Sequence, residues 1–512
     1  MDGHAPRRVI SWWRMKQYRA WTPEQSHLLP PSPLEWLPAG HLAYFLLELV
    51  RELDLTAIEE AIQSKDHRGT RPYSPRMMTT LILYAYSVGV YSSRKIERAT
   101  HEDVAFRVLS GGEHPHFSTV SDFRLQHRAL LAGFFREVLG LCRRAGLVSL
   151  GHVSLDGTKV QANASKHKAM SYARMKEEEK RLAAEVEAML FRADEVDREE
   201  DERYGEGQRP EDLPAELQTR EARLKMIRQA KAELEREAKE ARAAELLAGA
   251  AQNNEQAQSA PEPTTRKRFE TRARKLEEHV QKLFDDDDGA PPTAGAKSEL
   301  PQHRVARMPD GKPTPKAQRN FTDSDSRIMV KNGVFLQAYN AQIVVDEDAQ
   351  VIVAEAVGNQ APDVEYLEPL LMRTIANCAE VPDVVTADTG YFSKANVDAC
   401  ERLRVDPYIA VKRKLEKDGA LGRLPNNDKD AARQVMHAKL LRKIGRRIYS
   451  RRKTITEPVF GQIKQERGFR RFSLRGLSKV RNEWSIVCTC HNIMKLFRAI
   501  GSLKRLPIAA AG

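Results

Sequence analysis

The 512-residue chain has few cysteines and no long apolar segment. No apolar run reaches the roughly 18 residues that a membrane-spanning helix needs, and the basic N-terminus lacks the apolar core of a signal peptide. Disulfide bonds are not expected, because the five cysteines are too few and too scattered to form a framework: Cys142, Cys378, Cys400, Cys488 and Cys490. These absences predict a soluble protein of the reducing cytoplasm without a membrane partner.

Positive charge is what the chain has in excess. Its formal net charge is +12, from 83 Lys and Arg against 71 Asp and Glu. Because lysine and arginine neutralise phosphates and release their counterions, this balance points to a polyanionic partner. Charge alone does not separate DNA from RNA, or either from a membrane surface. The length predicts two to four domains, at roughly 100–200 residues each.

Residues 1–147 are predicted to form an all-α N-terminal domain. Apolar residues recur at helical spacing between Leu42 and Leu53, and a second helix is expected to open at Ser74-Pro75, where proline suits the first helical position. A capping pattern, Thr119-x-x-Asp122, predicts a third helix that runs on to Leu141. Within it, Ser118–Arg128 is interpreted either as a recognition helix that presents Arg124 to a DNA groove or as a structural helix with a basic face.

Residues 166–319 differ in composition from the rest of the chain. They are dense in Glu, Lys, Arg and Ala, and apolar residues follow helical or heptad spacing, with Lys231 breaking the pattern at a core position. We expect an inserted helical arm, in the form of a short antiparallel coiled coil. The alternative is a solvated, partly disordered charged insertion. The acidic run Asp285–Asp288 is interpreted as a linker rather than a metal site.

Residues 148–165 and 320–500 are predicted to form one α/β domain, followed by a tail over 501–512. Strands are expected over 148–160, 335–346, 350–357, 383–387 and 407–411, and helices over 363–377, 456–464 and 479–498. Strands and helices alternating on this scale suggest a layered sheet covered by helices. The charged arm would then be inserted after the first strand.

Two aspartates occupy positions suited to metal binding. Asp156 follows an apolar alternation and precedes Gly157, so it leaves a strand; the alternative is a tight Asp-Gly turn. Asp388 ends a short buried strand, and sites in open α/β sheets gather at the carboxyl ends of strands. The alternative for Asp388 is a turn or a helix N-cap. Mg²⁺ takes oxygen ligands, and two such ions can stabilise the attacking and leaving oxygens of phosphodiester chemistry.

A third acid is predicted at the start of a helix. Thr456 is a candidate N-cap, which places Glu457 and Pro458 in the first turn. Glu457, Gly461 and Lys464 would then share one face of the helix. A carboxylate, a position without a side chain and a cation could then lie in a row along a phosphate backbone. The alternative is a capped surface helix.

Three segments together resemble a known family. Ser154–Lys159, Thr386–Tyr391 and Glu457–Lys464 resemble, in that order, the acidic motifs of bacterial insertion-sequence DDE transposases. The branch that fits best has a tyrosine–arginine–glutamate–lysine signature around its last acid. Four further segments also resemble the family: 91–97, 116–124, 337–342 and 471–476. The resemblance covers most of the chain outside the charged arm.

This resemblance implies an RNase H-like catalytic domain and a metal-binding triad of Asp156, Asp388 and Glu457, with Mg²⁺ or Mn²⁺ as the cofactor. Lys464 follows the glutamate at the spacing of the signature and would contact DNA near the scissile phosphate. Tyr449 and Arg452 match less well, because four residues rather than three separate Arg452 from Glu457. Either Lys453 takes the arginine's place or the chain bulges by one residue.

The resemblance also implies a function and its partners. The N-terminal domain would bind the element's terminal DNA, the enzyme would cut there and join the freed end to target DNA, and a nucleoid-associated homo-oligomer is expected. The alternatives are a repurposed, inactive transposase that only binds DNA, and an RNase H-like nuclease or junction resolvase.

Overall fold

The computed structural model describes residues 32, 35–64, 71–165, 168–204, 215–284, 300–308, 310–331, 333–411 and 430–506. The acidic run Asp285–Asp288 lies outside these residues. Of the predicted tail, 501–506 is described and contains a short 3-10 helix, Leu503–Arg505. This helix is attached to the N-terminal helices, because the backbone N–H of Leu503 donates to Glu48 at 3.0 Å.

The N-terminal part is helical, as its apolar spacing predicted. Its helices are α1 (Leu42–Glu52), α2 (Thr56–Gln63), α3 (Pro75–Ser87), α4 (Ser93–Glu102), α5 (Val104–Ser110), α6 (Phe117–Gln126) and α7 (Arg128–Arg144). Helix α3 begins at the expected proline, with Ser74 as N-cap. The prediction of one helix capped at Thr119 was wrong. His116 caps α6, Thr119 lies inside it, and His127 separates it from α7, which carries most of the apolar positions assigned to that helix.

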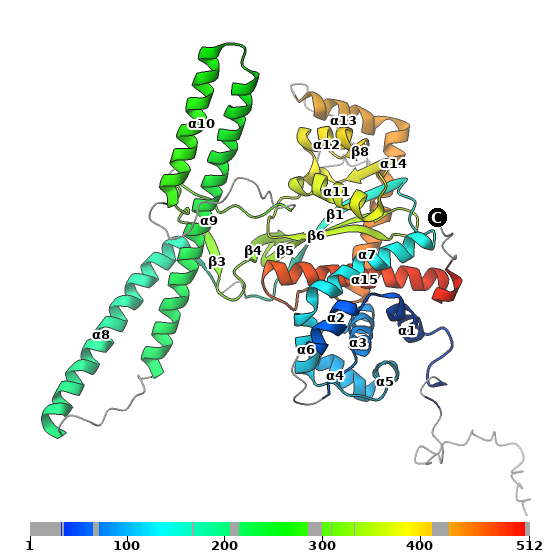
Figure 1. Ribbon diagram of the computed structural model, residues 1–512, viewed down its shortest axis with the longest axis horizontal. Helices are drawn as coiled ribbons and strands as arrows, with labels where there is room; N and C mark the ends of the chain where they lie inside the picture. Colours follow the sequence, from blue (N-terminus) through cyan, green and yellow to red (C-terminus); the bar gives the residue numbers. More distant parts are fainter. Residues whose placement is uncertain are drawn as a thin grey trace, which may run out of the picture.

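A mixed sheet forms the other half of the body (Figure 1). Its strands are β1 (His152–Gln161), β4 (Arg327–Lys331), β5 (Val334–Asp346), β6 (Ile352–Gly358), β7 (Val384–Ala387) and β8 (Asp406–Ile409). The long strand β5 pairs antiparallel with β1 along one edge. Along its other edge, the same stretch of β5 pairs antiparallel with β6. Strands β7 and β8 continue parallel to β1. The order across the sheet is therefore β6-β5-β1-β7-β8, with β4 pairing to the first residues of β5.

The helices that accompany the sheet are α11 (Leu367–Cys378), α12 (Lys394–Leu403), α13 (Ala431–Leu441), α14 (Lys443–Gly461) and α15 (Leu477–Ile500). Short 3-10 turns cover Val364–Tyr366 and Thr389–Tyr391. Helix α14 runs without a break through Thr456, and a π-helical turn, Gln462–Glu466, extends it. The prediction that a helix starts at Thr456 was therefore wrong, and Pro458 lies inside a helix rather than at its first position.

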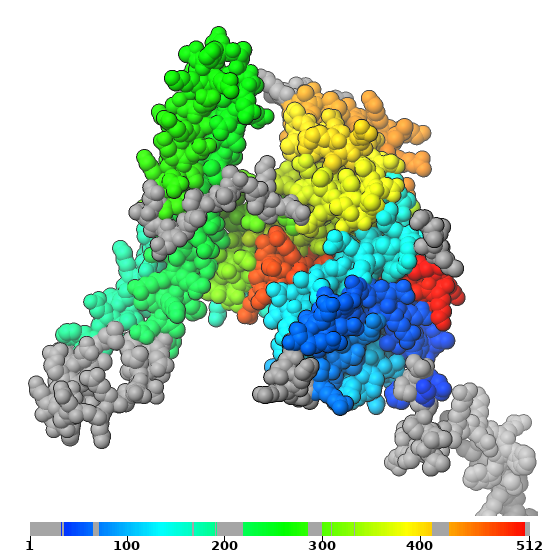
Figure 2. Space-filling model, viewed as in Figure 1, coloured from blue at the N-terminus to red at the C-terminus, as the bar shows by residue number. Residues whose placement is uncertain are grey.

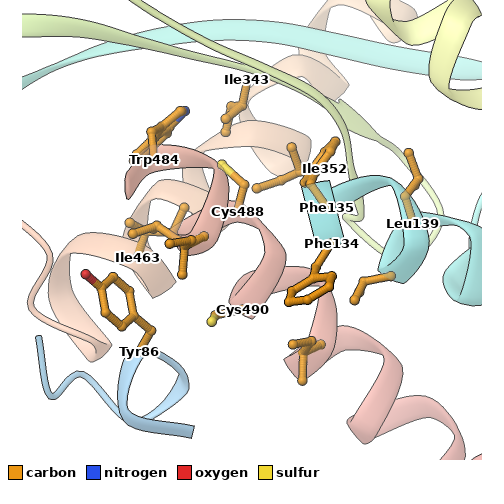
Figure 3. Packing of buried hydrophobic residues seen from close by; sticks show 14 of the residues in the cluster. Tyr86, Phe134, Phe135, Leu139, Ile343, Ile352, Ile463, Trp484, Cys488 and Cys490 are labelled. Atoms are coloured by element: carbon orange, nitrogen blue, oxygen red, sulfur yellow. The ribbon is translucent and has the colours of Figure 1, made fainter. Parts of the chain in front are cut away.

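Helix α15 joins the N-terminal helices to the sheet (Figure 3). The side chains of Trp484, Cys488 and Cys490 are buried between the two parts, and the Trp484 indole N–H donates to the carbonyl of Gln342 on β5 at 3.2 Å. One hydrophobic cluster consequently extends from α1 through α15 to the sheet. Among the helices of the described ranges, none is long and apolar enough to cross a bilayer.

The charged region folds as a helical arm. A short ribbon of β2 (Ala169–Ser171) and β3 (Gln318–Asn320) forms its base, and α8 (Tyr172–Tyr204), α9 (Ala215–Ser259) and α10 (Pro263–Phe284) follow between them. Figure 1 shows that α9 is shared by two hairpins pointing in opposite directions: α8 packs on its first half, and α10 packs on its second half. Lys231, the polar residue at a core position, forms an ion pair with Glu179 across the α8–α9 hairpin at 2.6 Å.

Buried arginines attach the arm to the sheet. Arg319 of β3 pairs with Glu237 of α9 at 2.7 Å and with Glu233 at 3.4 Å. Arg327 of β4 also reaches Glu237, at 3.4 Å. Both arginine side chains are almost fully buried, so these pairs are shielded from solvent. The arm is therefore held to the body near the middle of α9.

Candidate active site and its surroundings

Asp156 and Asp388 lie together where two parallel strands separate. Strands β1 and β7 pair from His152 and Val384 up to Leu155 and Ala387; Asp156 is the next residue of β1, and Asp388 directly follows the end of β7. The turn alternative for Asp156 is excluded, because β1 continues through it to Gln161. Burial raises the pKa of the Asp156 carboxyl; the charge of Asp388 raises it further, while the Arg452 guanidinium opposes both. The two carboxylates are therefore close enough to repel each other.

Helix α14 supplies partners to this pair of acids. Arg452 forms an ion pair with the Asp156 carboxylate at 3.1 Å, and the Thr456 hydroxyl donates to the same oxygen at 3.2 Å. Tyr449 is hydrogen-bonded to Arg452, and burial raises its pKa. These three residues recur at i, i+3 and i+7, which is one face of the helix. Lys453 is exposed, so the structure places Arg452 rather than Lys453 beside the acids.

Lys464 lies in the π-helical turn Gln462–Glu466 and reaches strand β1 beyond Asp156. Its ammonium donates a hydrogen bond to the hydroxyl of Thr158, two residues after Asp156 on β1, and lies 4.9 Å from the centre of the Phe460 ring. The π-helical turn carries this lysine past the end of α14. Burial, assisted by the charge of Lys331, lowers the pKa of Lys464 to about 8.

Glu457 is not brought into this group. It follows Thr456 on α14 and is therefore turned about 100° away from the face that meets Asp156. Its side chain is exposed. Within the described parts of the chain, no three His, Cys, Asp or Glu side chains are placed to hold a metal ion together. The structure thus brings Asp156 and Asp388, two of the three predicted acids, close to Tyr449, Arg452 and Lys464.

Arg124 does not lie where a DNA groove could reach it. The residue is only 6 % exposed. Its guanidinium donates to the Tyr86 hydroxyl at 3.1 Å, to the Tyr91 carbonyl at 2.9 Å and to the Ser93 hydroxyl at 3.4 Å. Tyr86 in turn contacts the carboxylate of Glu483, a fully buried residue of α15. Of the two interpretations of Ser118–Arg128, the structural helix therefore fits, and Arg124 is corrected from a DNA contact to a core residue.

Sequence reasoning missed Asp363, which lies next to Asp388. One oxygen of its carboxylate accepts hydrogen bonds from Lys159, Asn340 and Gln342 at 2.9, 2.7 and 2.8 Å. A Cβ at Gly390 would lie 3.0 Å from an Asp388 oxygen and 3.4 Å from an Asp363 oxygen, so both carboxylates border this glycine and a side chain there would have to displace one of them slightly.

Asp363 belongs to a buried polar network behind Asp388. The Tyr391 hydroxyl binds the amide oxygen of Gln342, which links the turn after Asp388 to strand β5. We interpret Asp363 as a positioning residue for this turn. The sequence signal that could have pointed to Asp363 is the segment 337–342, which resembles the family and contains both Asn340 and Gln342. Its side chains alone do not indicate that they share an acidic partner.

Two family models match the chain on either side of the arm. A transposase domain matches residues 32–126, and the transposase DDE domain matches residues 310–493. The chain belongs to the insertion-sequence DDE transposases. In this transposase, Asp388, Glu457 and Lys464 lie inside the second match, whereas Asp156 lies before it, on the other side of the arm in the sequence. No curated protein and no solved structure matches the transposase.

Proposed function

We propose that this transposase cleaves DNA at the ends of its element and joins the freed end to target DNA, using Asp156, Asp388 and Glu457. The observation that carries the proposal is the approach of Asp156 and Asp388 at the ends of the paired part of β1 and β7. The strand order β6-β5-β1-β7-β8, with β5 antiparallel to β1, supports an RNase H-like catalytic domain. Its proposed extent is residues 148–165 and 320–500, with the arm as an insertion and 1–147 as the end-binding domain.

The donor set of the site suits a hard divalent cation. Asp156 and Asp388 offer carboxylate oxygens, and their mutual repulsion is relieved when a cation lies between them. Mg²⁺, or Mn²⁺ in its place, would be held by these two acids, and Glu457 would join them only after the part of α14 that carries it turns toward Asp156. Bound there, it would stabilise charge on the oxygens of the reacting phosphodiester.

The remaining residues act on the DNA and on the acids. Arg452 and Thr456 hold the carboxylate of Asp156 in place. We propose that Tyr449, Arg452, Glu457 and Lys464 form the tyrosine–arginine–glutamate–lysine signature, with one extra residue accommodated within the continuous helix α14. Lys464 and Arg452 would contact the phosphates of the DNA end. Pairing of two ends calls for a homo-oligomer.

The third acid is tested by replacing Glu457 with glutamine. The substitution removes one negative charge and keeps the size of the side chain, so we expect end cleavage in Mg²⁺ to be lost while DNA affinity persists, since affinity comes mainly from Lys and Arg. The substrate is a plasmid carrying the gene with its flanking DNA. Glu466→Gln is the matched control, because Glu466 is an exposed acid in the adjoining π-helical turn. Normal cleavage by Glu457→Gln, or loss in Glu466→Gln alone, would reject Glu457. Full cleavage without any joining would favour a nuclease.

Engagement of the DNA end by Lys464 should depend on pH. With its pKa lowered to about 8, the lysine is charged below that pH and loses its charge as the pH rises through it. Its contribution to end binding should then fall by up to about tenfold per pH unit above 8. The measurement is a binding titration at pH 7 and pH 9 for the wild type and for Lys464→Arg, which stays charged. An identical pH dependence in both proteins would contradict the assignment.

A further inference from the structure

Helix α10 carries an uninterrupted line of basic side chains. Arg268, Arg272, Lys275, His279 and Lys282 follow each other at steps of four and three residues, and all are exposed. Such steps keep side chains on one face of a helix. At a rise of 1.5 Å per residue, the line extends about 21 Å along α10. We call these five residues the basic stripe.

The basic stripe is separate from the face that holds α10 in the arm. Val280 and Phe284 pack against α9, and Ala273 is buried on the same side of α10; each lies about 100° or more around the helix from the middle of the stripe. The acids of α10 also lie elsewhere. Glu270 and Glu278 pair with Arg266 and Arg274, both at 3.4 Å. Charge is therefore balanced beside the stripe but not on it.

The cations of the stripe are unpaired in the described part of the arm. In the described part of the chain, no ion pair involves Arg268, Arg272, Lys275 or Lys282. The α8–α9 hairpin differs, because there cations pair across the two helices, as Arg223 does with Glu178 at 2.9 Å and Arg228 with Glu179 at 3.2 Å. The stretch of α9 that faces α10, residues 243–259, contains two acids, Glu245 and Glu255, and Glu245 pairs with Arg242 and Arg307 rather than with the stripe. The stripe is thus not needed to hold the α9–α10 hairpin together.

We propose that the basic stripe binds the phosphate backbone of duplex DNA outside the active site. Duplex DNA carries one negative charge per about 1.7 Å of its axis, so a stripe of about 21 Å matches a continuous row of phosphates. Contacts of this kind are independent of base sequence. Figure 2 shows the α9–α10 hairpin standing out from the rest of the molecule, where a duplex can reach it. That the bound polyanion is DNA rests on the proposed function.

The test compares two fourfold variants of the full-length protein. The stripe variant is Arg268→Gln, Arg272→Gln, Lys275→Gln and Lys282→Gln. The control variant is Arg236→Gln, Arg266→Gln, Arg274→Gln and Lys394→Gln, which removes the same charge from exposed cations that each have an acidic partner one helical turn away. Binding of a 40-base-pair duplex of arbitrary sequence is measured by fluorescence anisotropy at several salt concentrations.

The slope of log K against log salt is negative, and each lost phosphate contact should make it shallower by about 0.9. We expect this slope to become shallower by up to about 3.6 in the stripe variant, which lacks four cations, and by less than about 1 in the control variant. An unchanged slope, or an equal loss in both variants, overturns the proposal. So does a stripe variant that binds DNA normally but no longer self-associates in sedimentation, since the stripe would then bind a second copy.

Failure of the stripe is distinguishable from failure of the catalytic proposal. Glu457→Gln should lose cleavage and keep the full salt slope, because it leaves the basic stripe intact. A wild-type protein that cleaves nothing yet shows the slope difference between the two variants would contradict the catalysis and retain the stripe. If the wild-type protein cleaves DNA but both variants have equal slopes, the catalytic proposal stands and the stripe proposal is overturned.

Discussion

Replacing Asp388 with asparagine is expected to lower end cleavage by about 10³-fold, the order of effect seen when one group that stabilises a transition state is removed. Asparagine keeps an oxygen that can accept the Gly390 N–H, which the Asp388 carboxylate binds at 2.8 Å, so the turn after β7 should persist. The change removes one of two neighbouring negative charges. It should therefore weaken divalent cation binding while lowering the pKa of Asp156, which the charge of Asp388 raises.

The measurement is cleavage in Mg²⁺ beside thermal unfolding and DNA binding. We expect cleavage to be lost with no decrease in melting temperature, because a repulsion is relieved. Asp383→Asn is a suitable control, since Asp383 immediately precedes β7 at the opposite end from Asp388 and is exposed. If Asp388→Asn cleaves as the wild type does, the pair of acids is not the catalytic centre.

Arg124→Ala is expected to destabilise the fold by about 3 kcal/mol, a typical loss when one member of a buried charged network is removed. The guanidinium links α6 to Tyr86 of α3 and, through it, to Glu483 of α15. Burial raises the pKa of Glu483, and Arg124 partly offsets this increase. Without Arg124, the Tyr86 hydroxyl and the Glu483 carboxylate lose a buried partner where α15 joins the N-terminal helices to the sheet.

Chemical unfolding of the full-length protein measures this loss. Lys95→Ala provides the comparison, because Lys95 is exposed on α4 and its removal should change the free energy of unfolding by less than about 0.5 kcal/mol. An Arg124→Ala protein of normal stability that binds DNA weakly would restore the recognition-helix interpretation instead.

The strands and their acids followed from local sequence, whereas several helical positions did not. Asp388 was predicted at the end of β7 because an apolar run of β-branched residues stops there. The position of Glu457 was misjudged, since Thr456 has the composition of an N-cap although the hydrogen bonds of α14 continue through it. What decides its environment is the contact of Arg452 and Thr456 with Asp156, residues about 300 positions apart in the chain. Local patterns do not contain that information.

Arg124 and Asp363 illustrate the same limit for polar residues. A basic residue on a helix is usually exposed, and only the packing of α3 and α15 around α6 makes Arg124 internal. Asp363 stands in an ordinary loop before a 3-10 turn, and its role depends on donors from β1 and β5. The arm was predicted as helical from its composition, but the sharing of α9 by two hairpins depends on which halves of it α8 and α10 cover.

Because α9 is a single helix of 45 residues, the arm can act as a lever. Its length is about 67 Å, and Glu237, the residue that Arg319 and Arg327 hold, lies at its midpoint and serves as the pivot. A rotation of roughly 10° about that pivot would move the two ends by about 6 Å in opposite directions. If α8 and α10 follow α9 as one rigid body, the two hairpins would then move in opposite directions.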